Sequence, residues 1–251
     1  MQYEANKEDG PQESVSRSNV PFIVIGTFLV FIAMMFLNTA SLEGFTEESK
    51  DGEIVFVPPE KVIMNTILSG STGALATMLL KNKILPNNGN FSQHKTLNTS
   101  ATCNGLIAGL VSVSAASQHM EQWAAAFVGT LGGLSYLVGC RIFTKLRIDD
   151  PLESSQVFGF GGFAGVLLAG LFDNKKGLFY VGNGGFRQIG IQVVGALTIV
   201  GYSIIVSSLA FFMIKKTGQL RVHKFYEIVG LDSLVHGQIL NQSIGKYSEV
   251  T

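Results

Sequence analysis

The sequence predicts an all-α fold, a polytopic transmembrane bundle of about six helices. Its mean hydropathy is positive at +0.34. Of its 251 residues, 47% are hydrophobic and only 14% are charged. This composition is too apolar for an ordinary soluble domain. Apolar stretches of about the 20 residues that a helix needs to cross a bilayer also recur along the chain.

The first expected helix, residues 21–41, contains no charged residue. An acidic loop over residues 42–60, closed by Pro58 and Pro59, separates it from a second expected helix over residues 62–80. That second helix contains a run of small residues from 69 to 74, which favours close packing of helices in lipid.

Four further helices are expected after a polar linker over residues 81–99. They cover residues 100–116, 122–143, 156–172 and 188–214. The chain is thus divided into a polar N-terminal tail (1–20), a transmembrane domain (21–214) and a C-terminal tail (215–251). Three of the helices carry glycines four residues apart, which lie on one helical face and predict close packing. The pairs are Gly105 with Gly109, Gly129 with Gly133, and Gly161 with Gly165.

The distribution of basic residues predicts the orientation. Most of the 18 lysine and arginine residues lie in the two tails and in the loops after the second and fourth helices. The positive-inside bias therefore places both termini on the cytoplasmic side, or on the matrix side if the membrane is mitochondrial.

Several classes of function find no support in the sequence. The formal net charge is zero, so no nucleic-acid partner is expected. The two cysteines, Cys103 and Cys140, belong to apolar segments and do not have metal-ligand spacing. No phosphate-binding loop and no nucleophile with a base is found, so we expect no cofactor, no metal and no enzyme activity.

The segment around the fifth helix resembles a known family. Asp149, Asp150 and Pro151 form a turn, and residues 157–162 then read VFGFGG. This is similar to the ammonium transporter family (Amt/MEP/Rh), in which an Asp-Asp-Pro turn precedes a helix with a Val-His-Gly-x-Gly-Gly core. The position of the family's pore histidine is held here by Phe158.

The resemblance extends over about residues 26–237. Residues 104–111, NGLIAGLV, resemble the family's Asn-Gly-x-x-Ala-Gly-Leu-Val run, and positions within residues 218–237 resemble its cytoplasmic C-terminal segment, with His236 at a matching position. The family's members have eleven helices in two inverted halves, form trimers, and conduct ammonia or ammonium. This chain corresponds to the last six helices, which implies a half-length relative that could form a homotrimer.

The resemblance also implies which residues occupy the pore positions. In the first helix, Met34 stands where the family has a tryptophan and Leu37 where it has a phenylalanine, whereas Asn38 and Ser41 match. Ser114 stands in place of a pore threonine. The family's two facing histidines relay a proton, and Phe158 has neither a proton to exchange nor a lone pair. We expect Asp149 and Asp150 to cap the fifth helix rather than to bind an ion.

These observations favour one function over three alternatives. We expect a transport-inactive, structural or accessory subunit of a larger membrane protein complex, in contact with lipid and with other subunits. A respiratory complex of the mitochondrial inner membrane is one candidate. The alternatives are an ammonium or ammonia channel formed with a partner half or by self-assembly, a membrane-bound ammonium sensor that signals through the C-terminal tail, and, least favoured, an enzyme.

Overall fold

The computed structural model describes residues 20–42, 46–48, 54–56, 58–85, 98–148, 150–218 and 220. Several parts singled out above lie outside these described residues. They are the N-terminal tail before Val20, most of the linker over 81–99, Asp149, and nearly all of the C-terminal tail with His236.

The described part confirms the predicted helical membrane bundle. The longer helices are α1 (Val20–Ala40), α2 (Pro59–Ile84), α3 (Thr99–Val113), α4 (Gln122–Leu146), the π-helix η1 (Ser155–Phe160) continuing into α5 (Gly161–Phe172), and α7 (Gly185–Lys216). A short α6 (Leu178–Val181) and a 3-10 turn η2 (Gly182–Gly184) precede α7. Five of these segments are long and apolar enough to cross a membrane, counting Ser155–Phe172 as one, and α3 is a shorter apolar helix.

Two details differ from the sequence expectation. The acidic loop contains an antiparallel pair of short strands, β1 (Thr46–Glu48) and β2 (Ile54–Phe56), with Thr46 opposite Phe56. Strands of three residues are too short for an alternating pattern to stand out in a polar loop. The third helix also ends at Val113, earlier than expected, because the backbone after it forms turns.

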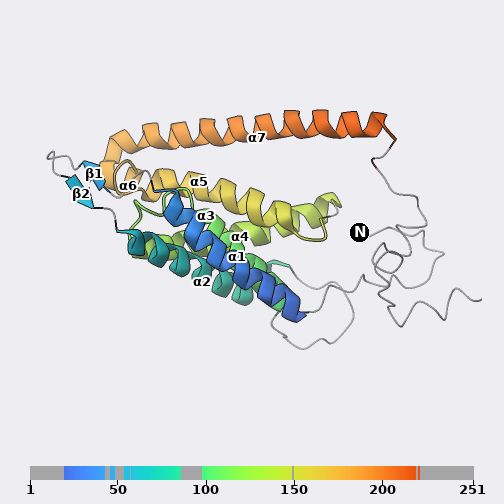
Figure 1. The fold of residues 1–251 in the computed structure, drawn as a ribbon, viewed down its shortest axis with the longest axis horizontal. Helices are drawn as coiled ribbons and strands as arrows, with labels where there is room; N and C mark the ends of the chain where they lie inside the picture. Colours follow the sequence, from blue (N-terminus) through green and yellow to red (C-terminus); the bar gives the residue numbers. More distant parts are fainter. Residues whose placement is uncertain are drawn as a thin grey trace, which may run out of the picture. The chain divides into compact units, whose positions relative to one another are not determined.

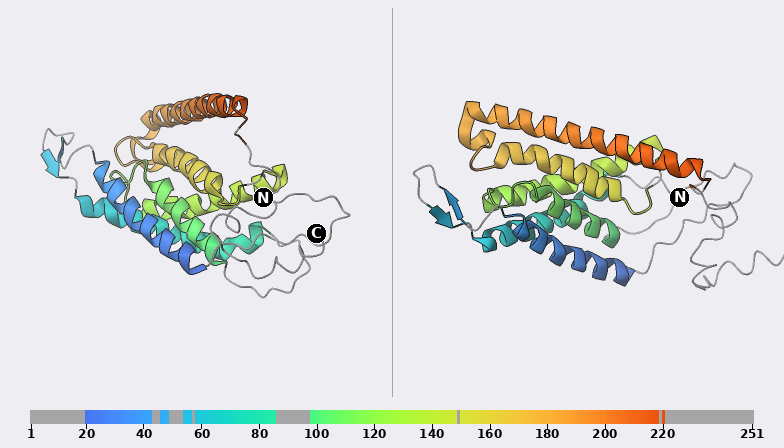
Figure 2. Two further views of the ribbon diagram at one scale, coloured as in Figure 1. Left: turned by 45° about the vertical axis from the view of Figure 1, so that its right-hand side comes forward. Right: turned by 45° about the horizontal axis from the view of Figure 1, so that its top comes forward.

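The chain divides into two compact units, Met1–Ala196 and Leu197–Thr251. The described part of the second unit is the continuation of α7 and the turn that follows it. In the first unit, α2 packs against both α3 and α4, which also contact each other. Helix α1 lies against α2 and α3, and α5 with η1 lies against α3 and α4 (Figures 1 and 2).

Small residues bring the central helices into backbone contact. A Cβ atom added to Gly73 of α2 would lie 2.6 Å from the Gly105 carbonyl oxygen of α3 and 3.0 Å from the Gly129 carbonyl oxygen of α4. Hydroxyl groups also join helices: Ser69 Oγ of α2 donates to the Gly109 carbonyl of α3 (2.7 Å), and Ser112 Oγ of α3 donates to the Gly161 carbonyl of α5 (2.8 Å). Such contacts are typical of helix association in lipid. They confirm that the glycine pairs predicted from the sequence lie at helix interfaces.

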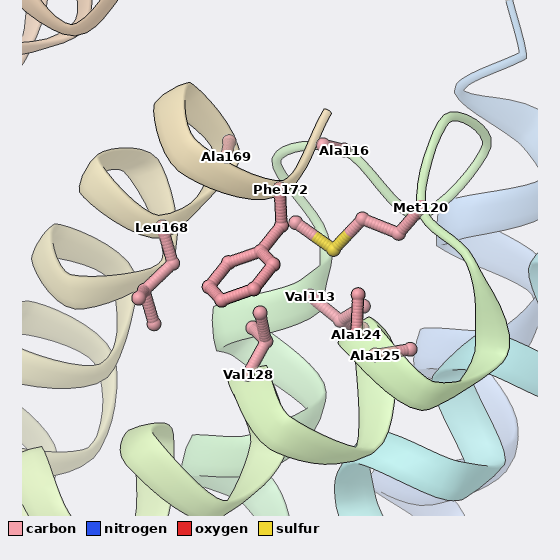
Figure 3. Packing of buried hydrophobic residues seen from close by; sticks show 9 residues of the cluster. All are labelled: Val113, Ala116, Met120, Ala124, Ala125, Val128, Leu168, Ala169 and Phe172. Atoms are coloured by element: carbon pink, nitrogen blue, oxygen red, sulfur yellow. The ribbon is translucent and has the colours of Figure 1, made fainter. Parts of the chain in front are cut away.

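Apolar side chains complete the core at the end of the bundle where α4 begins and α5 ends. In Figure 3, the ring of Phe172 reaches from α5 to lie between Leu168 and Met120, facing Val128 of α4. Trp123 packs its ring edge-to-face on Phe172, with 5.7 Å between ring centroids. The aromatic contacts tie the last turn of α5 to the first turn of α4.

Candidate functional site

The pore positions that the resemblance assigns to α1 differ in exposure. Leu37 is 57% exposed, whereas Asn38 is only 3% exposed. Asn38 Nδ2 donates a hydrogen bond to Thr66 Oγ1 of α2 (3.1 Å), so this amide joins two helices. Ser41 Oγ donates to the Leu37 carbonyl of its own helix (2.8 Å), and Met34 is half-buried.

Ser114 lies directly after α3, where it is the C-cap residue. Its hydroxyl donates to the Leu110 carbonyl (3.0 Å), just as the hydroxyl of Ser41, the residue after α1, donates to the Leu37 carbonyl. Both hydroxyls therefore use their only proton within their own helices, and each has its lone pairs left as acceptors.

Phe158 lies in the middle of the π-helical turn η1, a form of helix that occurs frequently at functional sites. Its neighbours Gln156 and Val157 are buried, but the Phe158 side chain is 53% exposed. Val157 belongs to an apolar cluster with Ala108 and Tyr136, so it fixes this turn against α3 and α4. The turn thus holds the Phe158 ring away from the core of this unit, and the ring has no group that exchanges a proton or accepts a hydrogen bond.

Polar groups organise the start of η1. The Asp150 carboxylate accepts the backbone N–H groups of Ser155 (2.9 Å) and Ser154 (3.3 Å). With its amide nitrogen turned toward Asp150, Gln156 also donates to Asp150 Oδ2 (2.8 Å) and to the Glu153 carbonyl (3.0 Å). Burial raises the pKa of the Asp150 carboxyl, but the N–H donors of Ser155 and Ser154 lower it by more, so its pKa lies below the ordinary value.

Glu153 forms a second polar contact that sequence reasoning missed. Its Oε2 accepts hydrogen bonds from Asn104 Nδ2 of α3 (2.7 Å) and from the Tyr136 hydroxyl of α4. Tyr136 is 1% exposed, so its hydroxyl depends on a protein partner. The partners are separated by 49 and 17 residues along the chain. No local spacing pattern could therefore have revealed them.

Comparison with known proteins decides the family. A sequence profile of the Ammonium Transporter Family matches residues 2–240. The chain belongs to the ammonium transporter family. Among curated relatives, "Putative ammonium transporter 1" of Caenorhabditis elegans is 31% identical over 245 residues, covering 92% of this chain and 43% of the relative. "Putative ammonium transporter 1 member 5" of Arabidopsis thaliana is 31% identical over 234 residues, covering 86% of this chain and 44% of the relative.

Solved structures agree with this family assignment. The "Sensor Amt Protein" superposes with a TM-score of 0.74 at 26% identity, covering 92% of this chain and 52% of that protein. Saccharomyces cerevisiae Mep2 superposes with a TM-score of 0.65 at 24% identity, covering 79% of this chain and 45% of Mep2. The chain therefore spans about half the length of the family members that it matches. With its apolar helices and this family, it is an integral membrane protein.

The described residues of this ammonium transporter family member contain few side chains that could relay a proton or bind a metal ion. The only described histidine is His119, which lies between α3 and α4 and outside both helices. The same residues contain no group of three or more His, Cys, Asp or Glu side chains that could hold a metal ion. Within the described ranges, therefore, these side chains bring together neither two histidines nor a cluster of metal-binding groups.

The Asp150 contacts predict how stability depends on pH. Because the pKa of this carboxyl is depressed in the folded state, it stabilises the fold above its unfolded pKa of about 4, and the contribution is lost as pH falls through the lower folded value. Asp150→Asn should lower stability near neutral pH by about 1 kcal/mol or less, because Ser154 and Ser155, whose N–H groups the carboxylate accepts, are exposed to solvent. Thermal unfolding in detergent, measured from pH 7 to pH 3, should show the unfolding temperature of the wild type approaching that of Asp150→Asn as the pH falls. A difference in unfolding temperature that stays constant over this pH range would contradict the prediction.

Proposed function

We propose that this member of the ammonium transporter family does not transport by itself and serves as a structural or accessory subunit of a larger membrane protein complex. The observation that carries the proposal is Phe158, which stands at the family's histidine position in η1. Moving ammonium through hydrocarbon requires groups that replace its hydration, since an unpaired cation there costs several kcal/mol or more. A phenylalanine offers the cation no lone pair and cannot relay its proton.

The other assigned positions support the same conclusion. Leu37 and Met34 lack the aromatic faces that attract cations. The hydroxyl protons of Ser41 and Ser114 are donated to the carbonyls of their own helices. The groups that build the fold are nevertheless present, including the Asn38–Thr66 bond between α1 and α2. A chain that keeps helix packing without pore chemistry fits a role as a scaffold for other subunits.

Several finer points belong to the proposal. Lipid and other membrane subunits would be the partners, and both termini would lie on the cytoplasmic or matrix side because of the loop charges. A mitochondrial respiratory complex of the inner membrane is one candidate assembly. Asp150 would act as a cap for the helix that contains Phe158, through its bonds to Ser154 and Ser155.

Copurification tests the accessory role directly. The tagged chain would be extracted in a mild detergent, separated by native electrophoresis, and its companions identified by mass spectrometry. We expect a stoichiometric set of unrelated membrane subunits. A small homo-oligomer, or a single partner that supplies the remaining helices and a pore histidine, would overturn the proposal.

The alternative function is an ammonium or ammonia channel formed with a partner half or by self-assembly, for example as a homotrimer. It is favoured by family membership and by the names of the relatives, which are called ammonium transporters. The chain contains only about half their length, so such a channel would need further helices from another copy or another chain.

Methylammonium uptake distinguishes the alternative from the accessory role. Cells that lack their own ammonium uptake and express this chain should take up no more methylammonium than cells with an empty vector. Phe158→His should leave uptake at that background, and Phe163→His provides a matched control five residues along the same segment. Uptake above background in wild type that changes with Phe158→His, but not with Phe163→His, would establish the alternative.

A further inference from the structure

The helix that contains Phe158 has one residue more than a continuous α-helix would need. Residues 155–160 form the π-helix η1, and α5 continues directly from Gly161, because the residues at the junction keep right-handed helical backbone angles. Hydrogen bonds in a π-helix join residues five apart instead of four, so a π-helical turn contains about one residue more than the α-helical turn that it replaces.

The C-terminal side of η1 is fixed by backbone contacts. The Gly161 carbonyl accepts a hydrogen bond from Ser112 Oγ of α3 (2.8 Å). A Cβ atom added to Gly165, one turn further along, would lie 2.3 Å from the Ser112 carbonyl oxygen. Sliding α5 by one residue would put Ala164 or Val166 in this place, and the side chain of either would collide with α3. Helix α5 therefore keeps its register.

The N-terminal side of η1 is held mainly by side chains. Val157 is 2% exposed and packs in an apolar cluster with Ala108 and Tyr136. Gln156 is also buried, and with its amide nitrogen turned toward Asp150 it donates to Asp150 Oδ2 (2.8 Å). One side chain can take the place of another when a helix slides by one residue, so this side of η1 can change its register.

The residues just before Gly161 have the space for such a change. Phe158 is 53% exposed, and a Cβ atom added to Gly159 would meet nothing within 4 Å. Sliding the preceding segment by one residue rotates it by about 100°. Phe158 would then take the buried place of Val157, and Gly159 would take the exposed place of Phe158. The non-helical turn at Glu153 would absorb the surplus residue.

We propose that η1 is a register switch with two states. In the first state, η1 is π-helical and Phe158 lies on the surface. In the second, η1 is α-helical, Phe158 occupies the place of Val157, and Gly159 replaces the ring on the surface. The second state is the minor one, because a phenylalanine crowds the cluster and Gln156 loses its hydrogen bonds. The switch presents or withdraws one aromatic ring, and it does not depend on whether the chain transports ammonium.

The contacts of Glu153 favour the π-helical state. Glu153 Oε2 accepts hydrogen bonds from Asn104 Nδ2 of α3 (2.7 Å) and from the Tyr136 hydroxyl of α4. They hold the turn before η1 in its present conformation, in which the φ of Glu153 is 57°. The second state requires this turn to move, so an interaction made only in the first state shifts the equilibrium toward it. Loss of either hydrogen bond should therefore populate the second state.

Two single-residue deletions test whether η1 contains a surplus residue. Deleting Gly159 removes that residue while Val157 and α5 keep their contacts, so the unfolding temperature in detergent should change by only a few degrees. Deleting Val166 from the regular helix α5 displaces the contacts on one side of the deletion and should lower the unfolding temperature by roughly 10 °C or more. Equal losses for the two deletions would overturn the proposal.

Fluorine NMR of the full chain in detergent tests whether two states are populated. Phe158→Cys would carry a trifluoromethyl tag that is small enough for the place of Val157. The native Cys103 and Cys140 would be replaced by alanine so that only one site is tagged. We expect two resonances, of which the weaker one comes from the buried tag and is protected from a paramagnetic additive.

Variants of the tagged chain connect the weaker resonance to the switch. Tyr136→Phe removes one hydrogen bond to Glu153 and should raise the population of the buried state several-fold. Deleting Gly159 should leave a single resonance. The same tag on Gly26→Cys, in open space on α1, is the control and should give one resonance that Tyr136→Phe does not change. A single resonance from tagged position 158 both with and without Tyr136→Phe, or two resonances that persist without Gly159, would overturn the proposal.

Discussion

Gly73→Val should abolish the native packing of the three central helices. A Cβ at this position would lie 2.6 Å from the Gly105 carbonyl oxygen, 3.0 Å from Gly109 Cα and 3.0 Å from the Gly129 carbonyl oxygen. All three are backbone atoms, so no side chain can rotate away to make room. Overpacking of this kind costs about 1–3 kcal/mol for a few extra carbons, and we expect the upper end of that range or more because two neighbouring helices must move together.

The measurement is thermal unfolding in detergent, followed by the fluorescence of the chain's single tryptophan, Trp123. This residue packs on Phe172, so its emission reports on the contact between α4 and α5. Gly26→Val is the matched control, because a Cβ at Gly26 of α1 meets nothing within 4 Å. Equal unfolding temperatures for Gly73→Val and Gly26→Val would show that the central helices are not held at backbone contact.

The helices of this protein could be predicted from local sequence, whereas most of the contacts between them could not. Each expected span differs from the observed helix by only a few residues at either end, for example 122–143 against α4, Gln122–Leu146. Hydropathy and span length are properties of consecutive residues, so they can be found without knowledge of the fold. The glycine pairs also indicated close approach correctly, because four-residue spacing places both on one helical face.

The candidate site was predictable only where a motif carried it. Phe158 was singled out because its neighbours in residues 157–162 match the family's pattern, and its place in the pore stays a prediction. Its exposure on a π-helical turn has no sequence signal. The Glu153 contacts were missed entirely because they join residues far apart in the chain.

Glu153→Ala should destabilise the bundle by about 3 kcal/mol, since hydrogen bonds to charged groups contribute about 1.5–3 kcal/mol each and two are lost. Glu153 Oε2 accepts from Asn104 Nδ2 of α3 and from the Tyr136 hydroxyl of α4. The substitution leaves the Tyr136 hydroxyl without this acceptor in a position where the side chain is 1% exposed. Glu153→Gln keeps one acceptor oxygen and should cost less.

A double-mutant cycle with Tyr136→Phe separates this contact from general effects of the substitution. Because the two side chains share one hydrogen bond, their losses should fall short of additivity by about 1 kcal/mol, within the range found for contacting residues.

The backbone of Glu153 adds a further comparison, since its φ of 57° lies in the left-handed region. Glycine tolerates this conformation, so Glu153→Gly should be roughly 1 kcal/mol less destabilising than Glu153→Ala. Additive losses of stability in the cycle would contradict the hydrogen bond between Glu153 and Tyr136. Equal losses of stability for Glu153→Gly and Glu153→Ala would contradict the left-handed backbone at this position. The two measurements therefore separate the side-chain contact from the backbone conformation, which together position the start of η1 and, with it, Phe158.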